Sequence, residues 1–225
     1  MRLVIGNKNY SSWSMRPWVL MKQLGIPFEE EKLRLDFTPG SAFRARLAEV
    51  SPVGKVPVLL DGDLAIWDTL AITEYLAEKL TGVAVWPRDA KARARARSLC
   101  AEMHSGFMSL RSKCPMNIEA SLPAVGAQLM AGDDGVPRDL ARITAMWTEA
   151  LQGSGGPFLF GEFSAADAFY APVVARLRTY ALPVPPQVAD YMARVWSAPG
   201  VAAWVAGALA EQDWIGEDEP YRPSR

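Results

Sequence analysis

The stretch Asn9-Tyr10-Ser11-Ser12-Trp13-Ser14-Met15-Arg16-Pro17-Trp18 decides the fold of this chain. It follows a short apolar run, Leu3-Val4-Ile5, and leads into apolar positions at helical spacing that predict a helix over 15–24. Hydroxyl groups therefore gather at the start of a helix. The first N–H groups of a helix have no internal partner and carry partial positive charge, so this turn suits an anion such as a thiolate.

Outward from this turn, the first eighty residues alternate between strands and helices. Gly54-Lys55-Val56-Pro57-Val58-Leu59 predicts a strand with a proline near its start, and Asp61-Gly62-Asp63 predicts a hairpin turn to the next strand. We therefore expect a mixed four-stranded sheet with an antiparallel edge. The expected elements are strand 2–6, helix 15–24, strand 28–35, helix 41–49, strands 56–61 and 64–67, and helix 68–80.

Beyond residue 89 the strand alternation disappears, and helical patterns predict an all-α second domain. We expect a domain over 1–80, a linker over 81–88 framed by Gly82 and Pro87, and a helical domain over 89–225. The expected helices are 89–114, 120–131, 137–152, 165–180, 188–197 and 200–212. The segment Ser164-Ala165-Ala166-Asp167 has the pattern of a capping box, whose role is in folding.

Composition limits the possible partners. Half of the 225 residues are hydrophobic, and 24 basic against 25 acidic side chains leave a net charge of -1, so we expect binding neither to nucleic acid nor to a membrane. Cys100 and Cys114 fall in one expected helix, about 21 Å apart, which is too far for a disulfide. Reduced thiols, together with the lack of a signal peptide or a spanning segment, predict a cytoplasmic protein.

Three signals in order, the serine-bearing turn, Val56-Pro57 and Asp68-Thr69, resemble those of the glutathione transferase family. The resemblance implies a thioredoxin-like first domain with its active site at the start of the first helix. Related oxidoreductases carry Cys-x-x-Cys there, but this turn contains hydroxyls and no sulfur, so dithiol exchange is excluded and the thiol must come from a ligand. The resemblance implies glutathione as that co-substrate, and no metal.

The serines are the candidate catalytic residues. Ser11-Ser12-Trp13-Ser14-Met15-Arg16 resembles the Ser-Ser-Cys-x-Trp-Arg signature of zeta-class transferases, with Trp13 in place of cysteine and Met15 in place of tryptophan. The resemblance makes Ser11 the thiolate partner, with Ser12 as second choice. Lowering a thiol pKa by one unit requires about 1.4 kcal/mol of differential stabilisation. The simpler alternative is that one of these serines only caps the helix.

The resemblance also implies the residues that bind glutathione. Val56 would pair through its backbone with the cysteinyl residue, Pro57 would be cis and Lys55 would meet a carboxylate. Thr69 would hold the γ-glutamyl carboxylate at a helix N-terminus, and Asp68 would meet the α-ammonium group. The alternatives are a strand-start proline at position 57 and a helix cap at position 68. The candidate glutathione-binding residues are Trp13, Lys55, Val56, Pro57, Asp68 and Thr69.

A second pocket is expected on helix 89–114. Its Glu-Met-His-Ser-Gly-Phe segment, residues 102–107, is very similar to one in bacterial transferases where the helix faces the second substrate. A helical wheel places His104 near Arg111, and Arg111 could orient an anionic substrate. The alternative is a purely structural histidine. The candidate pocket residues are Met15, His104, Phe107, Met108 and Arg111.

Together these features predict a glutathione S-transferase of the detoxification type that activates the thiolate for attack on a small electrophilic substrate. A glutathione-dependent isomerase of the maleylacetoacetate type is the first alternative. A non-catalytic dimerisation or scaffold protein with the same fold is the second. By family analogy we expect a homodimer.

Overall fold

The computed structural model describes residues 1–132 and 134–225, and its sheet lies in the first third of the chain. The strands are β1 (Arg2–Ile5), β2 (Glu29–Lys32), β3 (Val58–Asp61) and β4 (Leu64–Trp67). They pair in the order β2-β1-β3-β4, with β1 parallel to β2 and the other two pairs antiparallel. Gly62, at φ +62°, makes the tight turn between β3 and β4. The predicted mixed sheet with an antiparallel edge is confirmed.

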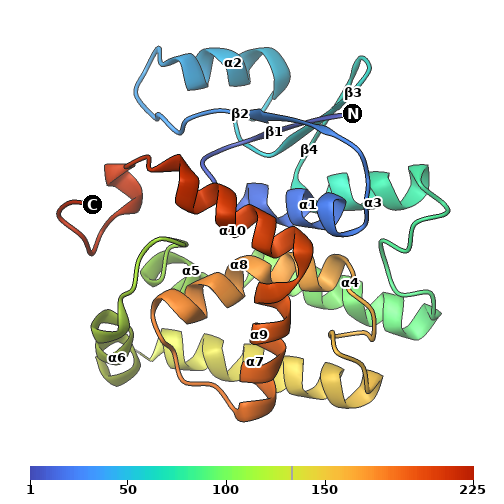
Figure 1. Cartoon of the computed structure of the whole chain (residues 1–225), viewed down its shortest axis with the longest axis vertical. Coiled ribbons are helices and arrows are strands. Elements are labelled where there is room, and N and C mark those ends of the chain that lie inside the picture. Colours follow the sequence, from blue (N-terminus) through green and yellow to red (C-terminus); the bar gives the residue numbers. More distant parts are fainter. Residues whose placement is uncertain (133) are drawn as a thin grey trace.

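Three helices accompany the sheet: α1 (Ser12–Gln23), α2 (Ala42–Val50) and α3 (Thr69–Lys79). Helices α1 and α3 lie on one side of the sheet and α2 on the other (Figure 1). Helices can cover both faces of the sheet because side chains alternate between the two faces along β1. Leu3 and Ile5 join the main core with α1, while the neighbouring side chains point to the opposite face. Ser41 caps α2, and its side chain accepts from the Arg44 N–H.

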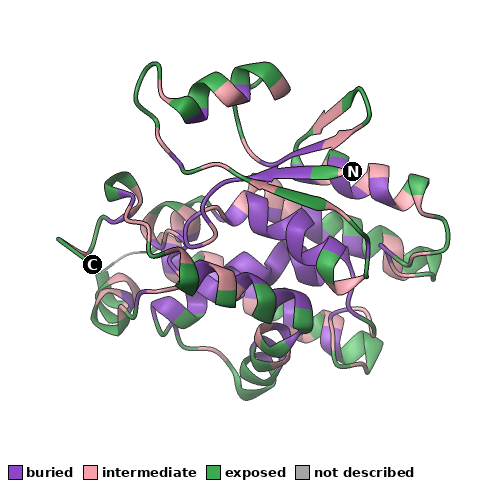
Figure 2. Cartoon of the chain, turned by 45° about the horizontal axis from the view of Figure 1, so that its top comes forward, coloured by how far each residue is buried: buried purple, intermediate pink, exposed green. Residues whose placement is uncertain are grey.

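The rest of the described chain is helical: α4 (Ala90–Ser105), α5 (Met108–Lys113), α6 (Pro123–Gly132), α7 (Gly135–Ser154), α8 (Ala165–Thr179), α9 (Pro186–Ser197) and α10 (Pro199–Glu211). Helix α8 is buried along almost its whole length at the centre of this bundle (Figure 2). Helix α1 packs against both α8 and α10. The helix that carries the serine turn therefore also joins the sheet to the helical bundle.

The prediction of one continuous helix over 89–114 is wrong, because the helix is interrupted at Gly106. Helix α4 ends at Ser105, Phe107 adopts a left-handed conformation at φ 55°, and α5 then begins. A Cβ at position 106 would lie 2.7 Å from the Glu102 carbonyl oxygen, so only glycine fits this turn. Arg111 Nη1 donates to the carbonyl oxygens of His104 and Gly106, each at 3.3 Å, and satisfies groups that the break leaves unpaired.

The predicted capping box at the start of α8 is present. The Asp167 carboxylate accepts from the Ser164 N–H at 2.9 Å, and the Ser164 hydroxyl accepts from the Ala166 N–H. Asp167 is fully buried and also accepts from the Leu159 N–H and the Tyr191 hydroxyl, both at 3.1 Å. One carboxylate therefore holds three segments of the helical bundle together.

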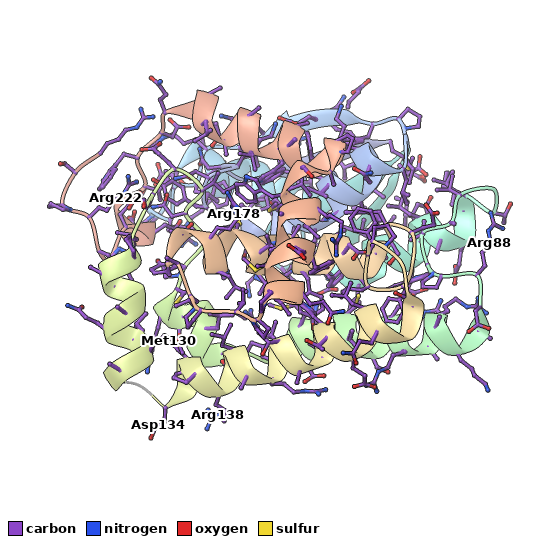
Figure 3. All side chains as sticks on the ribbon, turned by 60° about the horizontal axis from the view of Figure 1, so that its bottom comes forward. Arg88, Met130, Asp134, Arg138, Arg178 and Arg222 are labelled. Carbon is purple, nitrogen blue, oxygen red and sulfur yellow. The ribbon has the colours of Figure 1, made fainter. Side chains whose placement is uncertain are left out.

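The polar C-terminal end folds back over the molecule. A short 3₁₀ helix, Gly216–Asp218, follows α10, and the buried Glu219 accepts from the Tyr10 hydroxyl at 2.6 Å and pairs with Arg222. Arg222 lies on this segment, at the end of the molecule opposite Arg88 (Figure 3). The segment therefore ties the end of the chain to the loop that precedes α1. No helix in 1–132 or 134–225 is long and apolar enough to cross a membrane.

Candidate active site

Two adjoining cavities lie where the sheet domain meets the helices. The first, of about 490 Å³, we call the Thr69 cavity, and the second, of about 420 Å³, the serine cavity. Both have the size of small-molecule sites. The Thr69 cavity is lined by Trp13, Val53, Lys55, Val56, Pro57, Trp67, Asp68, Thr69, His104 and Arg111. The serine cavity is lined by Tyr10, Ser11, Ser12, Trp13, Leu35, Phe37, Phe43, Gly54, Lys55, Val56, Arg111, Pro115, Met116, Arg176 and Asp218.

Ser11 occupies the N-cap position of α1, but its side chain makes no capping hydrogen bond. Its hydroxyl donates instead to Ser14 Oγ at 2.7 Å, and Ser14 Oγ also accepts from the Gly6 N–H at 3.1 Å. Ser11 therefore does not cap α1 through its side chain. Ser11 lines the serine cavity while it belongs to a local network of hydroxyls.

Ser12 is the first residue of α1 and is almost completely buried, with 8% of its surface exposed. Its Oγ accepts a hydrogen bond from Arg176 Nη2 at 3.1 Å. Burial, and then the nearby Arg111, lower the pKa of Arg176 to about 10, so its guanidinium remains charged at neutral pH. A serine of the first domain is thus fixed to a cation on α8 of the second.

Val56 and Lys55 lie where the two cavities meet, since both residues line each of them. The Val56–Pro57 peptide bond is cis, as the resemblance implies. Within the described residues, the main-chain N–H and C=O of Val56 make no hydrogen bond. The backbone polar groups of Val56 are therefore available to a ligand in the two cavities.

Asp68 and Thr69 begin helix α3. Asp68, at φ 76°, caps the helix, because one of its carboxylate oxygens accepts from the Leu70 N–H at 2.8 Å. The alternative role of Asp68 as a helix cap is therefore correct for this oxygen. The other oxygen lies 3.1 Å from His104 Nε2. The Thr69 hydroxyl is buried without any partner among the described residues, although Thr69 lines the cavity. A buried hydroxyl is costly when unpaired, so an acceptor on a ligand would complete this site.

Trp13 lies between two cations. The guanidinium of Arg16 is 3.9 Å from the indole centroid and that of Arg111 is 4.8 Å away, while the His104 ring meets the indole edge-on at 5.0 Å. Burial, and repulsion from Arg176 and Arg111, lower the pKa of Arg16 to about 9. None of these three arginines pairs with a carboxylate in the described part of the chain. Arg16 lines neither cavity, but Lys55 and Arg111 line both and Arg176 lines the serine cavity, so basic side chains outnumber carboxylates on the walls of each.

Most of the residues that the sequence proposed line one cavity or both, but three do not. Met15 is fully buried in the main core, because its position in α1 turns it away from the cavities. The break after α4 places Phe107 in the same core and leaves Met108 60% exposed at the surface. Met108 reaches the site only indirectly, with its sulfur 3.6 Å from Arg111 Nη1.

Sequence reasoning missed Arg176 and Asp218. Arg176 lies in α8, whose largely apolar sequence predicts a core helix. The only sign in the sequence that Arg176 has another role is its charge within this apolar stretch. Asp218 lies in the 3₁₀ turn of the C-terminal segment, and burial raises the pKa of its carboxyl above the usual range. Neither residue belongs to a local motif, because chain folding alone brings them to the serine cavity.

A thioredoxin-like sheet domain, a cis-proline loop and a helical second domain define a two-domain protein with two adjoining cavities where the sheet meets the helices. Residues 10–79 match the family model described as glutathione S-transferase, N-terminal domain, and residues 115–207 match the model of the C-terminal domain. A glutathione S-transferase from Arabidopsis thaliana is 31% identical over 205 residues, which cover 87% of this chain and 74% of that protein. The chain belongs to the glutathione transferase family.

Solved structures agree with this assignment. A glutathione transferase homologue from Burkholderia with bound glutathione has a TM-score of 0.70 and 26% identity, over 93% of this chain and 98% of that one. A maleylacetoacetate isomerase from Methylobacterium extorquens, with bound malonate and glutathione, has a TM-score of 0.67 and 25% identity, over 92% and 97% of the two chains.

Proposed function

We propose that this protein is a glutathione S-transferase whose two adjoining cavities hold glutathione and a small electrophile. One observation carries the proposal: two cavities that share Trp13, Lys55, Val56 and Arg111 in their linings lead from the N-terminus of α3, past the backbone of Val56, unpaired among the described residues, to the hydroxyls at the start of α1. This sequence of features suits a peptide that has a carboxylate at one end and a thiol further along. The positively charged walls favour an anionic ligand.

The proposed contacts follow the order of groups along glutathione. Thr69 donates its hydroxyl to the γ-glutamyl carboxylate, assisted by the N-terminus of α3. Asp68 faces the α-ammonium group, Val56 pairs with the cysteinyl backbone, and Lys55 meets the glycyl carboxylate. Pro57 and Trp13 form walls of the site.

Glutathione supplies the sulfur nucleophile of the reaction. The role of the protein is to favour the thiolate over the thiol, because the thiolate is the reactive form. Ser11 and Ser12 are the candidate donors, and the start of α1 adds partial positive charge. The thiolate then forms a carbon–sulfur bond with the electrophile, which is held near Trp13, His104 and Arg111.

Isomerisation of a maleyl-type dicarboxylate is the second candidate function. Arg111 and Arg176 favour it, because both line the serine cavity and neither has a carboxylate partner among the described residues. Guanidinium groups bind carboxylates with matching geometry. The structural similarity to an isomerase with bound malonate and glutathione is in line with this candidate.

We also propose that the protein acts as a cytoplasmic homodimer. A reducing compartment fits Cys100 and Cys114, which are both free and buried. Leu64 supports a partner surface, because it exposes an apolar side chain on β4, an edge strand of the sheet. A purely scaffolding role would leave the unpaired Thr69 hydroxyl without an explanation.

The test is a calorimetric titration with glutathione, combined with ultraviolet detection of the bound thiolate between pH 5 and 10. We expect binding, and a thiol pKa lowered by at least about one unit from its free value near 8.5. Assays with a chloronitrobenzene-type electrophile and with a maleyl dicarboxylate then separate the transferase from the isomerase. Absence of binding, or binding with the free-solution pKa, would favour the scaffold role.

A further inference from the structure

We propose that Ser12, rather than Ser11, donates the hydrogen bond that stabilises the glutathione thiolate, and that Arg176 is the positioning residue that prepares Ser12 for this role. The inference rests on the proposed function and specifies its catalytic site. It reverses the order of preference that the zeta-class resemblance implies for the two serines.

The Ser11 side chain belongs to a local pair of hydroxyls. Its Oγ lies 2.7 Å from Ser14 Oγ, and the two groups share one hydrogen bond. Ser14 Oγ also accepts from the Gly6 N–H, which fixes the network to the end of β1. The side chain of Ser11 is therefore paired with a neutral hydroxyl, whereas that of Ser12 is paired with a cation. Ser11 is therefore better suited to holding the shape of the turn.

The Ser12 side chain accepts from a cation and, among the described residues, keeps its own proton free. Arg176 Nη2 donates to Ser12 Oγ at 3.1 Å, so the Ser12 oxygen acts as an acceptor. In the described part of the chain its own O–H has no acceptor, and Ser12 lines the serine cavity. A hydroxyl that accepts from a cation becomes a stronger donor, because hydrogen bonds in series polarise one another. Ser12 can thus donate to a thiolate without giving up an existing bond.

Burial and a second hydrogen bond hold Arg176 in place. The residue is 95% buried, with 5% of its surface exposed, and its Nη1 donates to the Cys114 carbonyl oxygen at 2.6 Å. The guanidinium is thereby held at the end of α5 while Nη2 points to Ser12. A cation in a poorly solvated site acts strongly on a nearby sulfur, because little water screens it. The thiol proton leaves to solvent, and the positive charge favours the anion that remains.

The other charged and titratable groups of the serine cavity do not replace this pair. Tyr10, in the loop before α1, donates its hydroxyl to Glu219, and burial together with this bond raises its pKa to about 12. Lys55 approaches from the loop before β3, Arg111 from α5 and Asp218 from the 3₁₀ helix. Ser12 is held directly by Arg176. Helix α8 of the second domain therefore takes part in the chemistry of the first.

The experiment compares the variants Ser11→Ala, Ser12→Ala and Ser12→Thr. Glutathione affinity is measured by calorimetry, and the pKa of the bound thiol by thiolate absorbance against pH. We expect Ser12→Ala to raise the bound thiol pKa by at least about one unit and to lower kcat/KM near neutral pH by roughly tenfold. Ser12→Thr keeps a hydroxyl and should retain most of the pKa shift. Ser11→Ala should raise the pKa by less than Ser12→Ala does.

Arg176 is tested by Arg176→Lys and Arg176→Gln, with thermal unfolding as the check on folding. We expect Arg176→Gln to raise the bound thiol pKa while glutathione still binds, and Arg176→Lys to fall between it and the wild type. If Arg176→Gln does not fold, the bound thiol pKa of Arg176→Lys and of the Ser12 variants tests the inference instead. A rise in pKa with Ser11→Ala but not with Ser12→Ala would overturn the inference. Wild-type protein that fails to bind glutathione or to shift its pKa would overturn the proposed function itself.

Discussion

Thr69 carries the clearest single sign of a ligand, because its side chain is buried and its hydroxyl has no partner among the described residues. Thr69→Val replaces the hydroxyl with a methyl group of similar size. We expect the Kd for glutathione to rise about tenfold, which corresponds to about 1.4 kcal/mol, when this hydrogen bond is lost. The free energy of unfolding without ligand should stay the same or increase, because an unpaired buried hydroxyl is removed. Calorimetry and urea denaturation measure the two quantities.

Thr73→Val is the matched control. Thr73 lies one turn further along α3, is fully buried, and donates its hydroxyl to the Thr69 carbonyl oxygen at 2.8 Å. It lines neither cavity. This variant should leave the Kd unchanged and should lower stability by about 1 kcal/mol. Equal effects of the two variants on the Kd would show that Thr69 does not contact the ligand.

Local motifs allowed much of the site to be predicted from the sequence. Val56-Pro57 and Asp68-Thr69 each lie within a few residues of a recognisable turn, and both dipeptides line the Thr69 cavity. Arg176 could not be found in this way, because it reaches Ser12 across 164 positions of the chain. Met15 was misplaced because residues in the first turn of a helix diverge by about 100° per step, so its neighbours reach the cavity while it enters the core.

At the scale of elements, the capping box of α8 controls the stability of the helical bundle. Asp167→Ala leaves the N–H groups of Leu159 and Ser164 and the Tyr191 hydroxyl without their buried acceptor. We expect the free energy of unfolding to fall by about 3 kcal/mol or more, because each unpaired buried donor is costly. Chemical denaturation followed by circular dichroism measures the change.

Asp89→Ala provides a comparison with an exposed cap. Asp89 accepts from the N–H groups of Lys91 and Ala92 at the start of α4, where water can replace it. Its removal should cost only about 1 kcal/mol, the usual value for an N-cap. If Asp167→Ala costs no more than Asp89→Ala, the bundle does not depend on its buried carboxylate.

The order of elements was predictable, but the break between α4 and α5 was not. Hydrophobic periodicity continues across Gly106, so the pattern indicated one helix. The deciding factor is the 2.7 Å approach of a Cβ at this position to the Glu102 carbonyl, together with a left-handed Phe107. Such a contact depends on three-dimensional geometry, and a lone glycine inside a helical pattern only hints at it.

At the scale of the whole molecule, the exposed face of β4 gives a test of the proposed dimer. Leu64, 47% exposed, lies on this edge strand and lines neither cavity, and Leu64→Arg would place a charge there. We expect light scattering after size exclusion to show a dimer for the wild type and a larger monomer fraction for the variant, because burying an unpaired charge is costly. Leu209→Arg, at a 48% exposed position on α10, is the control and should remain dimeric. A monomeric wild type would refute the homodimer.

The burial of the two cysteines determines how the protein responds to oxidative stress. Cys100 and Cys114 are fully enclosed, and burial raises the pKa of each thiol, so both remain protonated and hard for peroxide to reach. Because the proposed catalytic groups are hydroxyls, an oxidant would consume the glutathione supply of the cell while leaving these groups chemically intact. Activity would then recover as soon as reduced glutathione returns, without new protein synthesis or enzymatic repair.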